Sequence, residues 1–257
     1  MTSFEGKTLV VTGGCSGIGY ATVQNFLERN IQNVAILDID DPQNVIETLR
    51  NTFKKPNVIF IKTDVTKKDQ VKSAFAEVIS KFNYVDFLVA NAGVLREDDY
   101  ELTINVNLLG LTHTIYTGID VMNKDKGRGG IIISTASVAG LDGFYSMPVY
   151  SATKHGVIGL NRCLGTDHFY NKFGIKFLTV CPSFTDTPLI LDELGDRLSE
   201  GTLEATLHIK TVLLSQTSDV VGRSITETII HGANGSIWIV SNGETKEVKL
   251  KQYFIEA

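Results

Sequence analysis

A tyrosine and a lysine four residues apart, Tyr150 and Lys154, follow Ser137 at a spacing that a strand-loop-helix unit brings together. A phenol titrates near pH ~10 and is therefore a poor base at neutral pH. A lysine at i+4 on the same helical face is a nearby cation, which favours the phenolate. With the serine hydroxyl as a hydrogen-bond donor, the three groups have the chemistry to take a proton from an alcohol or return one to a carbonyl. Exposed helices often carry Tyr and Lys at this spacing, so this pair alone does not establish a catalytic site. Other motifs in the chain are needed to support that interpretation.

A glycine cluster near the N-terminus is the first element that would position this chemistry. Residues 12–19 read Thr-Gly-Gly-Cys-Ser-Gly-Ile-Gly, between the first β-branched run and the first amphipathic segment. Glycines at this place permit a tight turn, close approach of the backbone to a pyrophosphate and packing of helix on strand. The following helix N-terminus offers N–H donors to phosphate. Alone the cluster is often a plain turn, but in this context it predicts a dinucleotide site formed by Thr12, Gly13, Ser16, Gly17, Ile18 and Gly19.

An acidic residue, Asp38, ends the second predicted strand, nineteen residues after the last glycine of the cluster. A carboxylate here accepts hydrogen bonds from the adenosine ribose and repels a 2′-phosphate. The next residue is Ile39, and Ser16 precedes the third glycine, so neither position supplies a basic side chain. These features favour NAD over NADP, although the acids at 40 and 41 are alternatives for the same contact.

Composition limits the remaining function classes. The 257 residues, 43% hydrophobic and 21% charged, suffice for a substantial core in one α/β domain. A net charge of -5 without a run of basic residues argues against nucleic-acid or membrane-surface binding. No signal-peptide pattern or apolar run of ~20 residues is present. The cysteines at 15, 163 and 181 fit reduced thiols, and no spacing suggests a metal site, so we expect a cytoplasmic protein without metal.

Short β-branched runs alternate with longer amphipathic segments along the chain. Strands are predicted at 8–11, 34–37, 58–61, 87–90, 131–133, 177–180 and 235–240, and helices at 17–30, 43–54, 67–82, 100–123, 150–171 and 218–231. The runs are almost continuously apolar, as strands buried on both faces of a parallel sheet are. Repeated β-α-β units with right-handed crossovers predict an α/β fold with a doubly wound parallel sheet in a single domain, 1–257. Residues 1–183 would be mainly cofactor-binding and catalytic, and 185–215 a substrate-side insertion, either a packing element or a mobile lid.

Taken together, these motifs resemble the short-chain dehydrogenase/reductase family, which implies a Rossmann-type fold. The resemblance covers nearly the whole chain and rests on the cluster 12–19, Asp64-Val65, Asn91-Ala92-Gly93, Asn107, Ser137, Tyr150, Lys154 and Pro182, in that order. Within the family the chain is most similar to insect alcohol dehydrogenases and to NAD-dependent 15-hydroxyprostaglandin dehydrogenase. Segments 129–132, 148–156 and 234–238 carry this closer similarity.

The resemblance implies a function for each of these residues. Asp64 and Val65 would contact adenine; Asn91, Ala92 and Gly93 would line its ribose; Pro182, Thr185 and Thr187 would lie at the nicotinamide end, where Tyr150 and Lys154 also bind the cofactor. Tyr150 would be the general base and Ser137 would hydrogen-bond the substrate oxygen. Asn107 would hold a water that links Lys154 to solvent. Pairing of the helices near 100–123 and 150–171 implies a homodimer or homotetramer.

The chain departs from the family pattern at several positions. Ser183 replaces the usual glycine after Pro182, and 134–137 lacks the usual Asn-x-Ser-Ser form while keeping a serine at the catalytic place. Met147, a predicted substrate-binding residue with Ser137 and Tyr150, stands where prostaglandin dehydrogenases carry a glutamine. That difference favours the insect alcohol dehydrogenase side of the resemblance.

The sequence therefore predicts NAD-dependent oxidation of an apolar small-molecule alcohol to its aldehyde or ketone. The apolar residues expected near the pocket are Leu95, Val138, Leu141, Phe144, Tyr145, Met147 and the leucines of 189–198. Arg197 and Lys210 are cationic residues in the same segment that could serve an acidic substrate, so an acidic substrate stays an alternative. The alternatives are oxidation of a hydroxy fatty acid, as by a prostaglandin dehydrogenase, and a non-catalytic NAD-binding storage-like protein.

Overall fold

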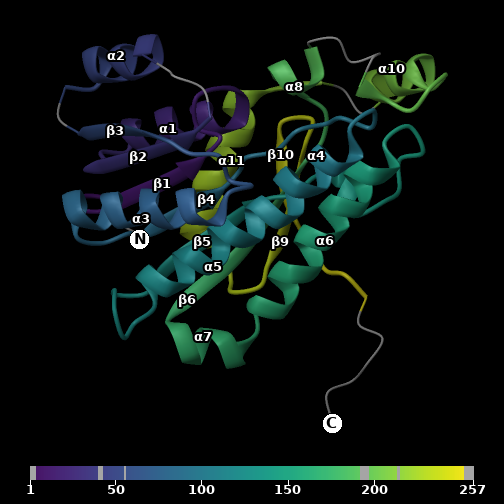
Figure 1. Cartoon of the computed structure of the whole chain (residues 1–257). Coiled ribbons are helices and arrows are strands. Elements are labelled where there is room, and N and C mark those ends of the chain that lie inside the picture. Colours follow the sequence, from purple (N-terminus) through teal and green to yellow (C-terminus); the bar gives the residue numbers. More distant parts are fainter. Residues whose placement is uncertain (1–3, 40–42, 55, 192–196, 213–214, 252–257) are drawn as a thin grey trace.

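The structure is a computed structural model that describes residues 4–39, 43–54, 56–191, 197–212 and 215–251. Its centre is a sheet of eight strands in the order β10-β9-β6-β5-β4-β1-β2-β3 (Figure 1). The strands are β1 Thr8–Thr12, β2 Asn33–Asp38, β3 Asn57–Lys62, β4 Phe87–Ala90, β5 Gly130–Thr135, β6 Ile175–Pro182, β9 Ile237–Ser241 and β10 Glu244–Val248. All neighbours pair in parallel except β9 and β10. The prediction of a doubly wound parallel sheet is confirmed.

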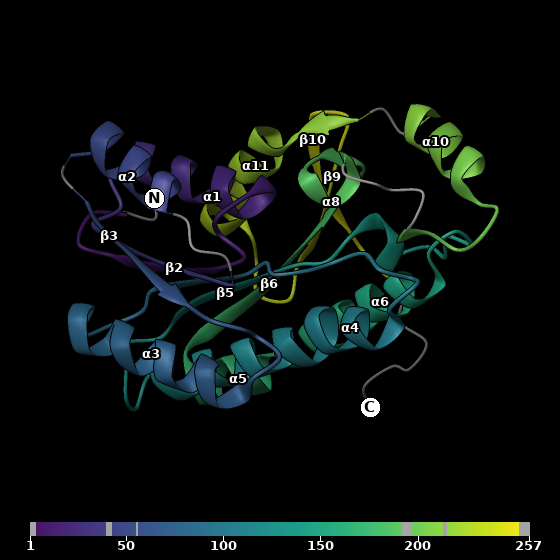
Figure 2. The same ribbon diagram turned by 45° about the horizontal axis from the view of Figure 1, so that its top comes forward.

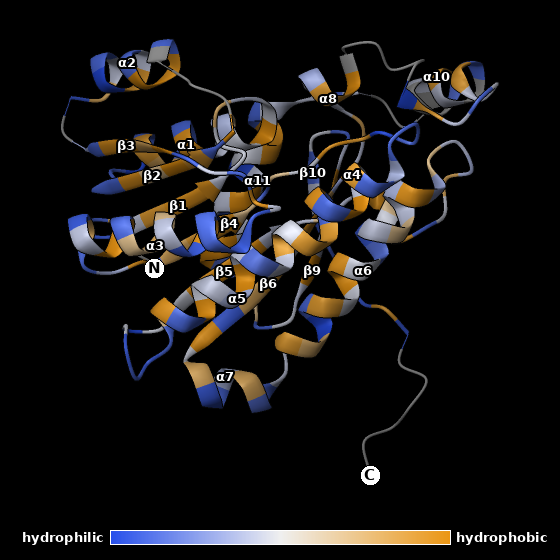
Figure 3. Cartoon of the chain, in the orientation of Figure 1, coloured by the Kyte–Doolittle hydropathy of each residue, from blue (hydrophilic) through white to orange (hydrophobic). Residues whose placement is uncertain are grey.

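Helices cover both faces of this sheet, as Figure 2 shows. One layer holds α1 Gly17–Glu28, α2 Gln43–Thr52 and α11 Ser218–His231; the other holds α3 Lys68–Phe82, α5 Leu111–Met122 and α6 Pro148–Leu164. Successive strand residues point to opposite faces, so Leu9 and Val11 pack in the first layer while Val10 packs in the second. Figure 3 shows the resulting apolar strands between helices with polar outer sides. The sheet thus has one apolar core on each face, and packing in these two cores fixes the positions of the strand ends.

The winding of the sheet reverses at β1, which pairs with β2 on one side and with β4 on the other. Connections from these neighbouring strands then leave toward opposite faces. In open α/β sheets, such a reversal opens a crevice at the carboxyl ends of the strands, where ligands bind. The glycine cluster after β1 and the segment after β4 both lie at this edge.

Two predicted helices differ in detail from the structure. The segment 100–123 forms α4 Tyr100–Ile104, a π-helical segment η1 Asn105–Gly110, and α5, and no sequence pattern indicated the π-helical part. The segment 150–171 breaks into α6 and α7 Asp167–Phe173. Gly165 is the C-cap of α6 and Thr166 the N-cap of α7. Tertiary contacts support the break: the Asn234 amide donates to the carbonyls of both residues, and a Cβ on Gly165 would collide with Gly235.

Several short elements complete the chain. Downstream of β6 lie β7 Thr185–Asp186, α8 Pro188–Leu191 and α10 Leu203–Val212, and β7 pairs with β8 Gln216–Thr217. A short 3₁₀ turn, η2 Val138–Gly140, follows β5. The antiparallel edge strand β10 was not predicted. Among the described helices none has the length and apolar character that crossing a membrane requires.

Candidate functional site

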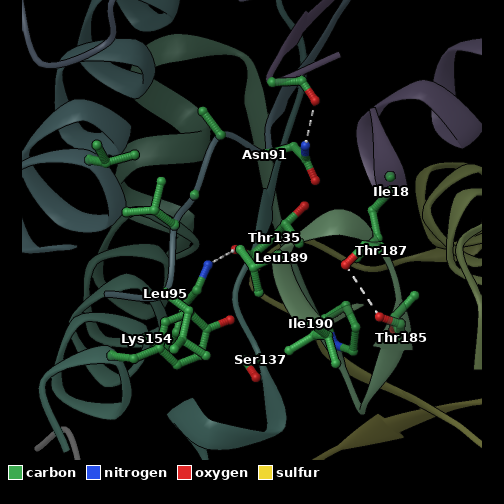
Figure 4. Close-up of a pocket in the computed structure, with 18 of the residues that line it drawn as sticks. Ile18, Asn91, Leu95, Thr135, Ser137, Lys154, Thr185, Thr187, Leu189 and Ile190 are labelled. Carbon is green, nitrogen blue, oxygen red and sulfur yellow. Dashed lines mark hydrogen bonds between the residues drawn. The ribbon is translucent and has the colours of Figure 1, made fainter. Parts of the chain in front are cut away.

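A cavity of about 460 Å³ opens at the carboxyl ends of the parallel strands. Most of the predicted site residues line it, namely Gly13, Ser16, Gly17, Ile18, Asp38, Asp64, Val65, Asn91, Ala92, Gly93, Ser137, Met147, Tyr150, Lys154, Pro182, Thr185 and Thr187. Figure 4 shows Lys154, Ser137 and Leu95 near one another and Ile18 beside Thr187. Thr12, Gly19 and Asn107 are outside the lining. One cavity therefore contains both the glycine cluster and the side chains of Ser137, Tyr150 and Lys154.

The glycine cluster forms a loop that only glycine permits at its critical positions. Gly17 has φ +50°, in the left-handed region that side chains disfavour. At Gly19, a Cβ would collide with the carbonyl oxygen of Gly13. Gly19 therefore lets α1 pack closely against the loop, which explains why it shapes the cavity without lining it.

Thr12 and Asn91 hold this loop against the end of β4. The Thr12 hydroxyl oxygen accepts the N–H groups of Asn91 at 3.1 Å and Ala92 at 3.3 Å. In return, the Asn91 side-chain amide donates to the Gly13 carbonyl at 3.0 Å (Figure 4). The structure thus gives Thr12 a supporting position behind the loop, whereas Asn91 both supports the loop and lines the cavity.

Asp38 lies at the end of β2, at the rim of the cavity. One of its carboxylate oxygens accepts the N–H of Cys15 at 3.0 Å and the other accepts the N–H of Ile39 at 2.8 Å. These bonds fix the carboxylate beside the glycine loop, where the ribose contact is predicted. The alternative acids at 40 and 41 lie outside the described residues.

Asp64 and Val65 form the wall beyond β3. The Asp64 carboxylate accepts both the N–H and the hydroxyl of Thr66, at 2.9 and 2.7 Å. The Val65 side chain is buried, and its carbonyl contacts Nδ1 of His113 at 3.1 Å. Both residues line the cavity, and their contact with adenine stays a prediction.

Ser137, Tyr150 and Lys154 converge from two elements. Ser137 is the N-cap of η2, and its Oγ accepts the N–H of Ala139 at 3.1 Å. Tyr150 lies in the first turn of α6 and Lys154 one turn later, so helical geometry places both on the same side. The buried Lys154 Nζ donates to the Thr135 carbonyl at 2.9 Å (Figure 4) and lies 5.5 Å from the centroid of the Tyr150 ring.

Burial dominates the electrostatics of these groups. It raises the pKa of Tyr150 to about 12, while a hydrogen bond from Ser137 acts in the opposite direction. Burial also lowers the pKa of Lys154 to about 8. We expect a nearby lysine to lower the pKa of a tyrosine, but burial is the largest influence on Tyr150 and the net shift of its pKa is upward. The buried thiol of Cys181, near Lys154, is neutral at physiological pH since burial raises its pKa to about 12.

Asn107 is completely buried in the π-helical segment. Its side-chain oxygen accepts the Val94 N–H at 2.8 Å, and its amide nitrogen donates to the Val94 carbonyl at 2.8 Å and to the Thr153 hydroxyl at 3.3 Å. Asn107 therefore joins the segment after β4 to helix α6, close to Lys154. The predicted water contact stays a prediction.

Two residues of the cavity lining carry buried hydroxyls. Thr135 Oγ1 and Ser183 Oγ are buried, line the cavity and have no hydrogen-bond partner. Buried polar atoms rarely lack a partner. Nearby, the Thr185 hydroxyl donates to the Ser183 carbonyl at 2.8 Å. The glycine loop and the Asp38 carboxylate fit a dinucleotide, which these residues would hold through phosphate and ribose contacts. No cluster suited to a metal ion occurs among the described residues.

The wall near Tyr150 is apolar. Leu95, Met147, Phe184 and Leu198 form a buried cluster, against which Phe144, Leu189 and Ile190 pack. Two predicted pocket residues were wrong: Leu141 packs against the main core and Tyr145 is 63% exposed, and neither lines the cavity. Leu198 belongs to the apolar cluster but is also outside the lining. Leu194 and the side chains of Leu191 and Lys210 lie outside the described part.

The structure also adds cavity residues that we did not predict from the sequence, among them Leu102, Val106, Thr135 and Phe184. Leu102 and Val106 lie at i and i+4, a helical spacing that indicates a shared face. Apolar residues also occur elsewhere in that segment, so the spacing alone could not separate a pocket face from a core face. Phe184 follows Pro182 by two residues. Its position just after a predicted strand is the sequence feature that could have indicated a cavity residue.

Comparisons with known proteins agree with this geometry. Residues 7–195 match the family model described as short chain dehydrogenase, and the chain belongs to this family of oxidoreductases. Alcohol dehydrogenase 1 of Ceratitis cosyra is 36% identical over 98% of both chains. The NAD(+) 15-hydroxyprostaglandin dehydrogenase of Mus musculus is 36% identical over 72% of this chain and 70% of its own. A short-chain dehydrogenase/reductase of Burkholderia phymatum, solved in complex with NAD, is 26% identical with a TM-score of 0.78, covering 90% of this chain and 88% of that one.

Proposed function

We propose that the protein is an NAD-dependent alcohol dehydrogenase that oxidises an apolar alcohol to the aldehyde or ketone. The observation that carries this proposal is that Ser137, Tyr150 and Lys154 share one cavity with the glycine loop and an apolar wall. A bound nicotinamide would supply the hydride acceptor, while the protein supplies orientation and electrostatics. The relative from Ceratitis cosyra, named an alcohol dehydrogenase, supports the same reaction class.

Each catalytic side chain has a definite task in this proposal. Tyr150 takes the proton from the substrate hydroxyl, and in the reverse direction returns it to the carbonyl. The Ser137 Oγ accepts the Ala139 N–H, which leaves its hydroxyl proton free to bond the phenol oxygen or the substrate oxygen. Lys154, together with the positive charge of an oxidised nicotinamide, opposes the burial that raises the pKa of the phenol.

The lining favours an uncharged, apolar substrate. Along the described lining Lys154 is the only cationic side chain, and its ammonium is already bonded to the Thr135 carbonyl. Met147 stands in the buried apolar cluster, where it offers a thioether in place of an amide. We therefore propose a neutral alcohol in preference to a hydroxy fatty acid, with 185–215 contributing the substrate side of the cavity through Leu189 and Ile190.

The first test is oxidation of an alcohol panel with NAD, including primary, secondary, isoprenoid and retinoid alcohols, with wild type and Tyr150→Phe. We expect NADH formation by the wild type and a loss of ~10²–10⁴ in kcat in the variant, because the general base is removed. The Kd for NADH should stay within a few-fold of wild type. Near wild-type turnover in Tyr150→Phe would refute the assignment, and NAD binding without turnover on any alcohol would favour the non-catalytic alternative.

Removal of the Ser137 hydroxyl should change the pH dependence of alcohol oxidation. Oxidation requires the phenolate, and the hydrogen bond from Ser137 lowers the pKa of Tyr150 against the larger effect of burial. In Ser137→Ala that pKa rises, so the rising limb of kcat/KM should move to higher pH. The control is Ser146→Ala, a buried serine whose hydroxyl makes no hydrogen bond and does not line the cavity. An unchanged limb in Ser137→Ala would contradict this role.

We further propose that Asp38 selects NAD over NADP. Its carboxylate accepts the Cys15 and Ile39 N–H groups at the rim and would oppose a 2′-phosphate by charge repulsion. Titration should give a Kd for NAD at least ~10-fold below that for NADP, a difference of about 1.4 kcal/mol. Asp38→Asn removes the charge and keeps one acceptor oxygen, so the ratio should approach one. A wild-type protein that binds NADP more tightly would overturn this preference.

A homodimer or homotetramer is the proposed assembly. Large apolar side chains are exposed along the helix that runs from α4 to α5, namely Tyr100, Ile104, Leu109 and Tyr116 at 56%, 42%, 44% and 52% exposure. Several such residues on one helix favour an interface with another protein surface. Light scattering at micromolar concentration should give two or four times the monomer mass, and Tyr116→Glu should reduce it. A monomer at that concentration would exclude the assembly.

A further inference from the structure

The catalytic helix α6 lacks a capping side chain of its own. A helix begins with backbone N–H groups that have no partner inside the helix. In α6 the first residue, Pro148, has no N–H, and the Ser151 N–H already bonds the Met147 carbonyl at 2.9 Å. The residue before the helix is Met147, whose thioether makes no capping hydrogen bond. The N–H groups of Val149 and Tyr150 therefore need an acceptor from elsewhere.

Glu97 supplies that acceptor from the segment after β4. One carboxylate oxygen accepts the Val149 N–H at 3.1 Å, and the other accepts the Tyr150 N–H at 2.8 Å. A carboxylate at this place is favourable because it meets the positive end of the helix dipole and forms charge-assisted hydrogen bonds. Glu97 therefore acts as a distant N-cap, fifty-three residues from the tyrosine that it contacts.

The same residue also contacts the substrate side of the cavity through its backbone. The Glu97 N–H donates to the Arg197 carbonyl at 2.9 Å, and two residues later the Ser199 N–H donates to the Ser146 carbonyl at 3.0 Å. Between these bonds, Leu198 is buried in the cluster with Leu95 and Met147. Segment 197–199 is thus hydrogen-bonded to Glu97 at one end and, at the other, to Ser146 in the segment that leads into α6.

We propose that Glu97 is a positioning residue that fixes Tyr150 by capping α6 and joins the start of this helix to segment 197–199. The inference rests on the proposed function, in which Tyr150 is the general base. Glu97 does not line the cavity, so it acts through the backbone of Tyr150. Without its carboxylate, the first turn of α6 has two unsatisfied N–H groups and frays. A displacement of ~1 Å at a reacting group can reduce a rate by ~100-fold.

Steady-state kinetics of Glu97→Ala and Glu97→Gln with the best alcohol of the panel test the catalytic consequence. We expect Glu97→Ala to lower kcat by ~10–100-fold while the Kd for NADH stays within twofold, since the cofactor loop is untouched. Glu97→Gln should fall between, because an amide has one acceptor oxygen for two N–H groups. The control is Glu101→Ala, which removes the same charge from an exposed position on α4 and should match wild type.

Amide hydrogen exchange, followed by NMR without substrate, tests the cap itself. In Glu97→Ala the amides of Val149 and Tyr150 should exchange at least ~10-fold faster, and that of Ser199 should also lose protection, while amides of β1 should not change. Glu97→Gln provides the same comparison if the alanine variant does not fold. Unchanged exchange at Val149 and Tyr150, or a kcat within twofold of wild type, would overturn the proposal. If the wild type oxidises no alcohol but exchange changes as expected, the proposed function fails and the cap stands.

Discussion

The whole site depends on the meeting of β1 and β4 at the carboxyl edge of the sheet. There the Thr12 hydroxyl accepts two N–H groups of the segment after β4, and the Asn91 amide returns a bond to the glycine loop. The same segment continues through Val94, held by Asn107, to Glu97 at the start of α6. A single stretch of seven residues, 91–97, therefore connects the dinucleotide loop to the helix that carries Tyr150 and Lys154.

Desolvation acts on Tyr150 and Lys154, the groups that we propose carry the chemistry. The packing that orients Tyr150 and Lys154 also raises the pKa of one and lowers the pKa of the other, so each is displaced toward its neutral form. Groups with perturbed pKa values in a cavity are typical of active sites. In this chain the opposing effects come from the Ser137 hydroxyl and from any positive charge brought into the cavity. The protonation state of the Tyr150 phenol is thus sensitive to the charge of any molecule bound in the cavity.

Sequence patterns predicted those parts of the structure that depend on local rules. Apolar β-branched runs marked seven strands of the sheet, and the glycine cluster marked the loop after β1. The missed β10 reads Glu-Thr-Lys-Glu-Val and lacks an apolar face, although the preceding Asn242-Gly243 is a strong hairpin signal. The Glu97 cap was unpredictable from local rules, because it depends on a contact between residues fifty-three positions apart. The break at Gly165 had a local signal, a glycine followed by Thr166 at the N-cap of α7, which the prediction of one helix over 150–171 did not use. The prediction that Tyr145 lies near the pocket was wrong, because closeness in sequence to Tyr150 does not determine whether a side chain faces the cavity or the solvent.

The π-helical segment η1 changes the rotational register of the long helix in which it lies. Leu102 and Val106 face the cavity, while Ile115 and Met122, further along the same helix, are buried in the core against the sheet. In a regular α-helix each residue advances the direction of its side chain by ~100°, and a wider turn alters that phase for everything that follows. The helix can therefore present one side to the cavity and a separately aligned side to the sheet. Deletion of one residue within 105–110 would keep the helix yet turn its two halves out of alignment, so the length of this segment matters as much as its composition.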